Sequence, residues 1–157
     1  MLLLSLLISE PVPVVVWGIE DIGGSSNVVL VDTAGKRLVL IGVSGDQALA
    51  IGLALEGLAY PRPLTHDLFI SLLDSLGWKL EKVVVTRLEN DIFYSDIYLR
   101  KGKKKMVMDA RPSDALNLAL RAGCRVYVEE DVLDEYTNEL LNILQELQAH
   151  EEEGIGI

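Results

Sequence analysis

Two short polar segments carry the side chains of this chain that are best suited to chemistry. The first polar segment, residues 61–67, reads Pro-Arg-Pro-Leu-Thr-His-Asp, and the second polar segment, residues 109–115, reads Asp-Ala-Arg-Pro-Ser-Asp-Ala. If the two segments lie side by side, their carboxylates could hold Mg²⁺ or Mn²⁺ and orient a water molecule against a phosphodiester, while arginine takes up the developing negative charge. The same arginines could equally pair with the same carboxylates and only fix the loops.

The side chains of the two segments divide into distinct roles under the enzymatic hypothesis. One histidine and three aspartates form the catalytic set, in which the histidine is the general base or acid and the aspartates are also the metal ligands: His66, Asp67, Asp109 and Asp114. Four further side chains bind the substrate: Arg62, Thr65, Arg111 and Ser113. Under the alternative hypothesis the chain is a non-enzymatic dimeric scaffold or regulatory binding module, and the same residues form a structural salt-bridge network.

The second polar segment falls where a strand is expected to end and a helix to begin. Pro112 disfavours helical backbone for Arg111 before it. Ser113 is a favourable N-cap, and Asp114 then lies in the first turn, where the helix dipole favours an anion. A well-capped helix with no further role would explain the same residues, so the functional interpretation depends on the first segment lying beside it.

The periodicity of apolar residues and the turn residues between them predict an α+β fold. Strands are expected at residues 14–19, 28–31, 37–43, 80–88, 92–99, 105–110 and 125–128, and helices at 46–57, 67–76, 114–122 and 131–150. Because most strands are grouped in hairpins, the sheet is expected to be mixed and mainly antiparallel, with helices packed on it. Residues 1–130 form one domain, and residues 131–157, an amphipathic helix and tail, belong to the same unit.

An internal repeat organises this pattern. Gly35 and Gly102 are separated by 67 residues (102 − 35), and the same offset aligns residues 39–41 with 106–108 and Ala48 with Ala115. Each half therefore reads as a hairpin, a polar turn and an apolar helix, although two independent uses of one common motif would give the same pattern. If the halves pack side by side, the two polar segments can meet at one rim of the sheet.

The predicted C-terminal helix has a regular apolar seam with spacings of 3, 4, 3 and 4: Leu133, Tyr136, Leu140, Ile143 and Leu147. Such an a/d seam packs either on the parent domain or on a second copy in a homodimer. The mean hydropathy of +0.29 also favours some burial between subunits. We therefore expect a homodimer, with packing on the parent domain as the alternative.

The net charge and the N-terminal residues limit which partners and which cellular location are expected. The net charge of −10 repels nucleic acid at long range, so any nucleic-acid contact needs a local basic patch, and the only candidate is Arg100–Lys105. Residues 1–8 are apolar but lack the basic region of a signal peptide, and Pro11 ends the run short of a membrane span. We interpret them as an edge or interface strand and expect a cytoplasmic protein that does not enter the membrane.

The two polar segments together resemble the bifunctional nuclease domain family, formerly a domain of unknown function. The resemblance rests on residues 56–68, from Glu-Gly to His-Asp-Leu, and on the second polar segment, and it covers about residues 14–135. It implies a compact α+β domain, a dimer, and nuclease activity on RNA and DNA. One departure is Asp46-Gln47, where the family usually has an acidic residue followed by alanine.

Overall fold

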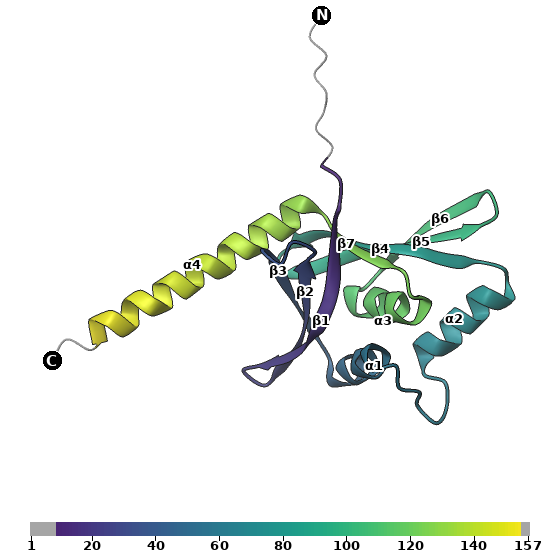
Figure 1. The fold of residues 1–157 in the computed structure, drawn as a ribbon, viewed down its shortest axis with the longest axis horizontal. Coiled ribbons are helices and arrows are strands. Elements are labelled where there is room, and N and C mark those ends of the chain that lie inside the picture. Colours follow the sequence, from purple (N-terminus) through teal and green to yellow (C-terminus); the bar gives the residue numbers. More distant parts are fainter. Residues whose placement is uncertain (1–8, 155–157) are drawn as a thin grey trace, which may run out of the picture.

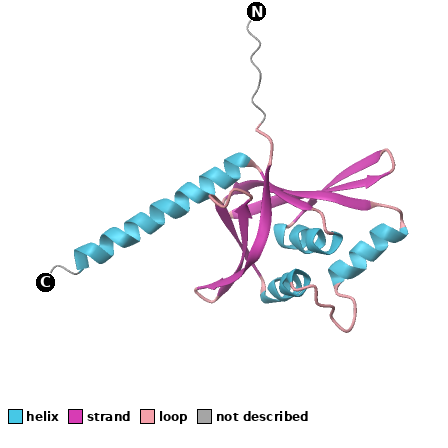
Figure 2. Cartoon of the chain, in the orientation of Figure 1, coloured by secondary structure: helices cyan, strands magenta, loops and turns pink. Residues whose placement is uncertain are grey.

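The computed structural model describes residues 9–154, which fold as one mixed sheet with helices packed on it (Figures 1 and 2). The strands of this part are β1 (Val12–Ile22), β2 (Ser25–Asp32), β3 (Leu38–Val43), β4 (Lys79–Glu89), β5 (Ile92–Lys101), β6 (Lys104–Ala110) and β7 (Arg125–Val128). Their order in the sheet is β3-β2-β1-β7-β4-β5-β6. Among the strands of residues 9–154, only β4 and β7 pair in parallel, so the predicted α+β class with a mainly antiparallel sheet is confirmed.

The helices of the described part are α1 (Gly45–Leu55), α2 (Thr65–Ser75), α3 (Pro112–Ala122) and α4 (Glu130–Gly154). Helices α1, α2 and α3 lie together beside the sheet, with α3 packed against the other two (Figure 1). Four apolar side chains of α3 are fully or almost fully buried: Ala115, Leu116, Leu118 and Ala119. Gly123 then adopts the left-handed conformation that ends α3, as the sequence predicts.

The internal repeat is visible in the element boundaries. Adding 67 to the bounds of β1 gives those of β4 (12 + 67 = 79 and 22 + 67 = 89), and adding 67 to the bounds of α1 gives those of α3 (45 + 67 = 112 and 55 + 67 = 122). The two units β1-β2-β3-α1 and β4-β5-β6-α3 also occupy mirrored places in the strand order, on either side of β7. Each half therefore contains three strands and a helix, one strand more than the predicted hairpin and helix.

The two faces of the sheet differ sharply in burial. Along β5, Ser95, Ile97 and Leu99 are buried, whereas the residues between them are only half-buried. Because side chains alternate between the faces of a strand, these buried positions define an inner face that packs on the helices and an outer face that points away from the core. The inner face joins Val83 of β4 and Leu116 of α3 in one hydrophobic core.

Two predicted helix N-caps are wrong, by two residues for α3 and by one residue for α2. Ser113 was expected to cap α3, but the N-cap is Arg111, and Pro112 is the first helical residue. Proline suits that position because its fixed φ matches the helix and its missing N–H would be unpaired there. Likewise Thr65 was expected to cap α2, but Leu64 is the N-cap and Thr65 begins the helix.

Helix α4 begins on the domain and then extends away from it (Figure 1). Its first turns are anchored, with Leu133 fully buried and the Asp134 carboxylate 2.6 Å from Arg37. Further along the predicted seam, Ile143 and Leu147 are exposed. The seam thus packs on the parent domain only in its first half, and the homodimer stays a prediction. Within residues 9–154, no helix is long and apolar enough to cross a membrane. The strand expected at residues 1–8 lies outside the described residues.

Candidate functional site

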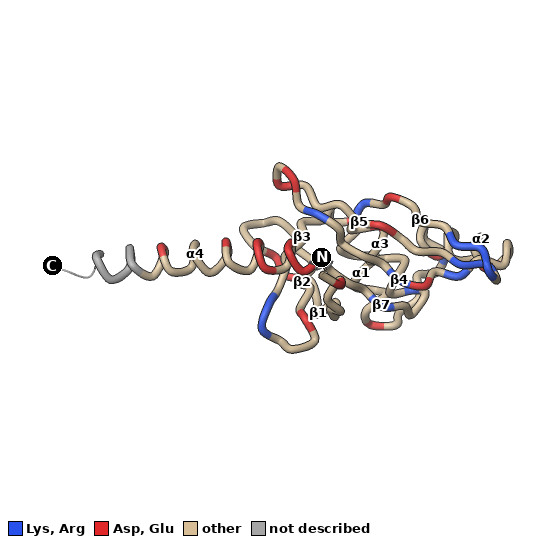
Figure 3. Tube along the Cα trace, turned by 90° about the horizontal axis from the view of Figure 1, so that it is seen from above, with Lys and Arg blue, Asp and Glu red and all other residues tan. Residues whose placement is uncertain are grey.

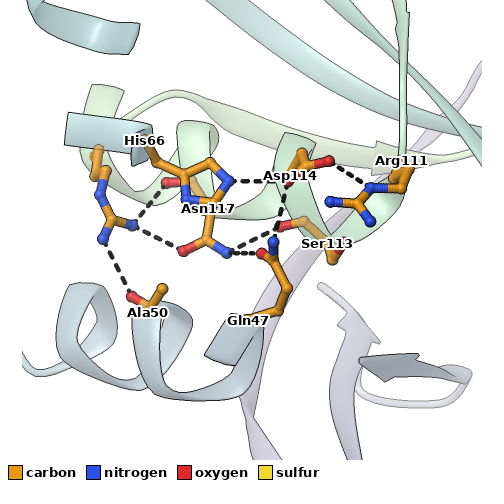
Figure 4. A network of polar contacts seen from close by, with 8 residues as sticks. Gln47, Ala50, His66, Arg111, Ser113, Asp114 and Asn117 are labelled. Atoms are coloured by element: carbon orange, nitrogen blue, oxygen red, sulfur yellow. Dashed lines mark hydrogen bonds and ion pairs between the residues drawn. The ribbon is translucent and has the colours of Figure 1, made fainter. Parts of the chain in front are cut away.

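The first turns of α2 and α3 bring the two polar segments together. His66 lies in the first turn of α2 and Asp114 in the first turn of α3, and His66 Nε2 is 3.0 Å from Asp114 Oδ1. Figure 4 shows this contact as part of a larger polar network between the helices. The expectation that the two segments meet is therefore confirmed.

Asp114 contacts three other side chains of this network. Its Oδ1 also accepts a hydrogen bond from Gln47 Nε2 at 3.2 Å, and its Oδ2 accepts one from Arg111 Nε at 2.7 Å (Figure 4). Burial alone would raise the pKa of Asp114, but the hydrogen bonds from Arg111 and His66 outweigh it and hold the pKa below its usual value. Asp114 is therefore a carboxylate anion at neutral pH.

Gln47 and Asn117 are members of the network that sequence reasoning missed. Asn117 is completely buried and donates hydrogen bonds to Gln47 Oε1 at 2.8 Å and to the Ser113 carbonyl oxygen at 3.0 Å. A signal for Gln47 was present, because Gln47 and Asp114 are 67 residues apart and thus equivalent positions of the internal repeat. Asn117 carried no comparable signal, since a single polar residue in an apolar helix is also compatible with solvent exposure.

The network continues to Asp67 through Arg121, which sequence reasoning also missed. Arg121 Nε donates to Asp67 Oδ1 at 2.6 Å, and its guanidinium also bonds Asn117 Oδ1 and the Ala50 carbonyl oxygen. Asp67 Oδ2 accepts the backbone N–H of Leu64, as a helix-capping carboxylate does. Burial acts to raise the pKa of Asp67, but these hydrogen bonds lower it below its usual value.

Asp109 does not join the other predicted metal ligands. It pairs in register with Asp96 of β5, between the buried Ser95 and Ile97, and so lies on the outer face of the sheet. Asp114 is on a helix that packs on the inner face. Within the described part of the chain, no three His, Cys, Asp or Glu side chains are grouped to hold a metal ion. The structure therefore does not gather Asp67, Asp109 and Asp114 around one point.

The predicted substrate-binding residues differ in accessibility. The Arg111 side chain is 72% exposed although its Nε is bound to Asp114. Arg62 is exposed in the loop before α2, and Thr65 is exposed at the start of that helix. Ser113 is partly buried and lines a cavity. Arg111 is thus the one predicted substrate-binding residue that combines exposure with a direct contact to the network.

The polar network reaches a cavity at each end. One cavity, of about 590 Å³, is lined by Gln47, Arg111 and Ser113 together with apolar side chains such as Phe93 and Ile143. The other, of about 460 Å³, is lined by residues that include Asp67, Arg121 and Tyr60. Both volumes lie within the usual range of small-ligand sites. A ligand in the first cavity can contact the exposed guanidinium of Arg111.

Comparison with known proteins identifies relatives that share this region. An uncharacterized protein of Mycobacterium tuberculosis (strain ATCC 25618 / H37Rv) is 40% identical over 105 residues, which is 67% of this chain and 62% of the relative. Bifunctional nuclease 1 of Oryza sativa subsp. indica is 30% identical over 90 residues, or 55% of this chain and 27% of the relative. Bifunctional nuclease 2 of Arabidopsis thaliana is 30% identical over 101 residues, which is 62% of this chain and 30% of the relative. This chain therefore covers less than two thirds of the length of each of these relatives.

A family model gives the wider assignment. The model of the bifunctional nuclease domain matches residues 28–140, which include both polar segments and every member of the network described above. The match spans more than half of the chain, and it agrees with the resemblance found in the polar segments. The chain therefore belongs to the bifunctional nuclease domain family.

Proposed function

We propose that this chain is a phosphodiester hydrolase of nucleic acids whose chemical centre is His66, Asp114 and Arg111. The observation that carries the proposal is the contact of 3.0 Å between His66 Nε2 and Asp114 Oδ1, beside the exposed Arg111 guanidinium. Membership of the bifunctional nuclease domain family supports it. The matched regions make up only 27% and 30% of the two plant relatives named bifunctional nucleases, so their activity supports the proposal without defining it.

The geometry suggests how the centre works. A carboxylate that binds one imidazole nitrogen orients the ring and stabilises the imidazolium that forms when the other nitrogen takes a proton. Asp114 binds Nε2 of His66, which leaves Nδ1 to accept a proton from a water molecule that attacks phosphorus. The bond from phosphorus to the leaving nucleotide oxygen breaks, and that oxygen takes a proton from the imidazolium or from solvent. Arg111 uses Nε for Asp114, so its two terminal nitrogens remain to bind phosphate oxygens as charge develops.

The predicted divalent ion fits this arrangement poorly. Both carboxylate oxygens of Asp67 and both of Asp114 already accept hydrogen bonds, and Asp109 lies on the other face of the sheet. Mg²⁺ is often held by only one or two carboxylates, with water and substrate phosphates as its other ligands. Dependence on Mg²⁺ or Mn²⁺ thus remains a proposal, which cleavage assays in EDTA and in either ion test directly.

Cleavage of labelled single-stranded RNA and DNA by wild type and His66→Gln tests the proposed centre. Glutamine can still donate a hydrogen bond to Asp114 but cannot take a proton, so we expect a folded protein with a cleavage rate lower by about 10²–10⁴. His150→Ala, which changes the only other histidine, is the matched control and should cleave like wild type. Equal cleavage by His66→Gln and wild type would refute the role of His66.

One observation favours a second candidate, the non-enzymatic scaffold or binding module. The network joins α1, α2 and α3 through the fully buried Asn117, which is how a purely structural network holds helices in register. In that case the wild type does not cleave nucleic acid in EDTA, Mg²⁺ or Mn²⁺. Substitution of network residues then lowers stability and changes nothing else.

A further inference from the structure

The outer face of the sheet carries a cluster of tyrosines and basic side chains, which we name the tyrosine–lysine platform: Lys82, Tyr98, Arg125 and Tyr127. Lys82 of β4 pairs in register with Tyr98 of β5 on one side and with Arg125 of β7 on the other. Its Nζ lies 4.6 Å from the centre of the Tyr98 ring and 5.6 Å from that of Tyr127. The three strands therefore place the Lys82 ammonium group between two aromatic rings, one on each side.

These side chains point away from the core. The residues that follow Lys82 and Arg125 and precede Tyr98, namely Val83, Val126 and Ile97, belong to the buried core of the inner face. Lys82, Tyr98 and Tyr127 are only half-buried, and Arg125 is exposed. A second pair extends the platform along β5, because Arg87 lies 3.8 Å from the centre of the Tyr94 ring. The outer face thus carries two groups in which a cation lies over an aromatic ring, with Asp96 between them.

The charge of this part of the chain is opposite to that of the rest. Residues 79–110 contain eight Lys or Arg and five Asp or Glu, a net charge of +3, whereas the whole chain has −10. The remaining residues therefore carry −13 (−10 − 3). Figure 3 shows Lys and Arg gathered at the end of the molecule near the β5–β6 turn, and Asp and Glu along the described part of α4. A polyanion is drawn to the first end and repelled from the second.

Acidic residues also lie on the outer face, with Asp96 between Tyr98 and Tyr94. Asp96 of β5 and Asp109 of β6 face each other in register on the outer face, two positions from Tyr98 and from Val107. On the other side, Arg100 pairs with Lys105, followed by the hairpin lysines Lys101, Lys103 and Lys104. A bound phosphate backbone is therefore expected on the side of the hairpin lysines, away from the two aspartates.

We propose that the tyrosine–lysine platform, together with the lysines of the β5–β6 hairpin, binds single-stranded nucleic acid. Bases stack on the rings of Tyr98 and Tyr127, and Lys82, Arg125 and the hairpin lysines hold the phosphates. A single strand is favoured over a duplex because only unpaired bases offer their faces for stacking. The aromatic rings favour it over an acidic protein segment, which basic side chains alone would bind.

The proposal rests on the proposed hydrolase function, for which it names the substrate class. Strand β6 ends at Ala110, and Arg111 follows directly at the start of α3. A strand that reaches the exposed guanidinium of Arg111 from the platform therefore has to pass Asp109, which directly precedes Ala110. Binding and cleavage are then carried by separate groups of residues, so they can be measured separately.

Fluorescence anisotropy with fluorescein-labelled dT20, U20 and a DNA duplex tests the proposal on the full chain. We expect Tyr98→Ala/Tyr127→Ala to weaken binding of both single strands by tenfold or more, because each base stacked on an aromatic ring contributes substantially to affinity. Tyr98→Phe/Tyr127→Phe keeps both rings and should bind like wild type. This Phe pair also separates lost stacking from lost folding, which circular dichroism checks.

The lysines have their own expected effect. Lys103→Ala/Lys104→Ala/Lys105→Ala should reduce the slope of log affinity against log salt by about 2, since each phosphate contact of a single strand contributes about 0.7. Lys36→Ala, which removes an exposed lysine from the β2–β3 turn, is the charge control and should leave the slope unchanged.

The outcomes separate this proposal from the proposed function. Three results would overturn the platform. The alanine pair could bind like wild type, wild type could bind duplex and single strands with equal affinity, or the variants could change only self-association in sedimentation. If wild type binds in the expected way but cleaves nothing, the platform stands and the hydrolase fails. If wild type cleaves and the alanine pair cleaves and binds equally well, the hydrolase stands and the platform fails.

Discussion

Asp114 shows how a single carboxylate connects two distant parts of the sequence. Its two oxygens accept hydrogen bonds from His66, Gln47 and Arg111, so three segments of the chain are held by one side chain. Types and spacing of residues were enough to select His66, Arg111 and Asp114. They could not show that Asp67 is bound by Arg121, because an arginine in the last turn of a helix also serves the helix dipole.

The lowered pKa values of Asp67 and Asp114 give a pH dependence with a definite sign. Their ionised forms are stabilised in the folded state, so the contribution to stability is present above the ordinary aspartate pKa of 3.8 and is lost as pH falls through the lower folded values. Urea unfolding between pH 3 and 6 should show stability falling below about pH 4, with a smaller fall in Asp67→Asn. Asp74→Asn, an exposed carboxylate change on the same helix, is the control; an equal fall in wild type and Asp67→Asn would contradict this origin.

Asn117 should be among the most sensitive polar residues of the fold. Replacing it by alanine removes one buried hydrogen-bond partner from each of Gln47, the Ser113 carbonyl and Arg121. We expect Asn117→Ala to lower the free energy of unfolding by roughly 2–4 kcal/mol, since each lost buried partner costs about 1–3 kcal/mol and losses in one network overlap. Asn138→Ala, at an exposed position of α4, should change stability by less than about 0.5 kcal/mol in the same measurement.

At the scale of elements, the sequence predicted most strands and helices because turns and apolar periods mark them. It could not assign the face of Asp109, since Met106, Val107 and Met108 are all apolar and hide the alternation of β6. The structure assigns Asp109 to the outer face because β6 pairs in register with β5, in which buried and half-buried residues alternate clearly. Three consecutive apolar residues on an edge strand thus concealed that two predicted metal ligands point to opposite sides.

Helix α4 offers an element-scale test of the homodimer prediction. Leu133 is fully buried in the domain, whereas Leu144 is 48% exposed. Leu133→Ala should therefore lower the free energy of unfolding by about 2–5 kcal/mol. Leu144→Ala should lower it by less than about 0.5 kcal/mol if the chain is a monomer. A loss of similar size in both variants, dependent on protein concentration, would instead show that a second copy covers the exposed half of α4.

At the scale of the whole molecule, two repeated units bring equivalent helices together and place the polar network between them. The offset of 67 residues that aligns α1 with α3 also relates Gln47 to Asp114, which are hydrogen-bonded. The same architecture places the lysine-rich β5–β6 hairpin and the acidic α4 at opposite ends of the molecule (Figure 3). The two proposals therefore place hydrolysis on the helix side of the sheet and binding of a single strand on the opposite side.

Chemical rescue of His66→Ala tests the proposed centre most directly. Single-turnover cleavage of a labelled single-stranded RNA is measured for wild type and variant, with and without added imidazole. We expect the variant to cleave about 10²–10⁴ times more slowly than wild type and to regain activity in proportion to the imidazole concentration, because free imidazole replaces the lost base. Cleavage by His66→Ala at the wild-type rate, without any response to imidazole, would contradict the assignment of hydrolysis to this pair of helices.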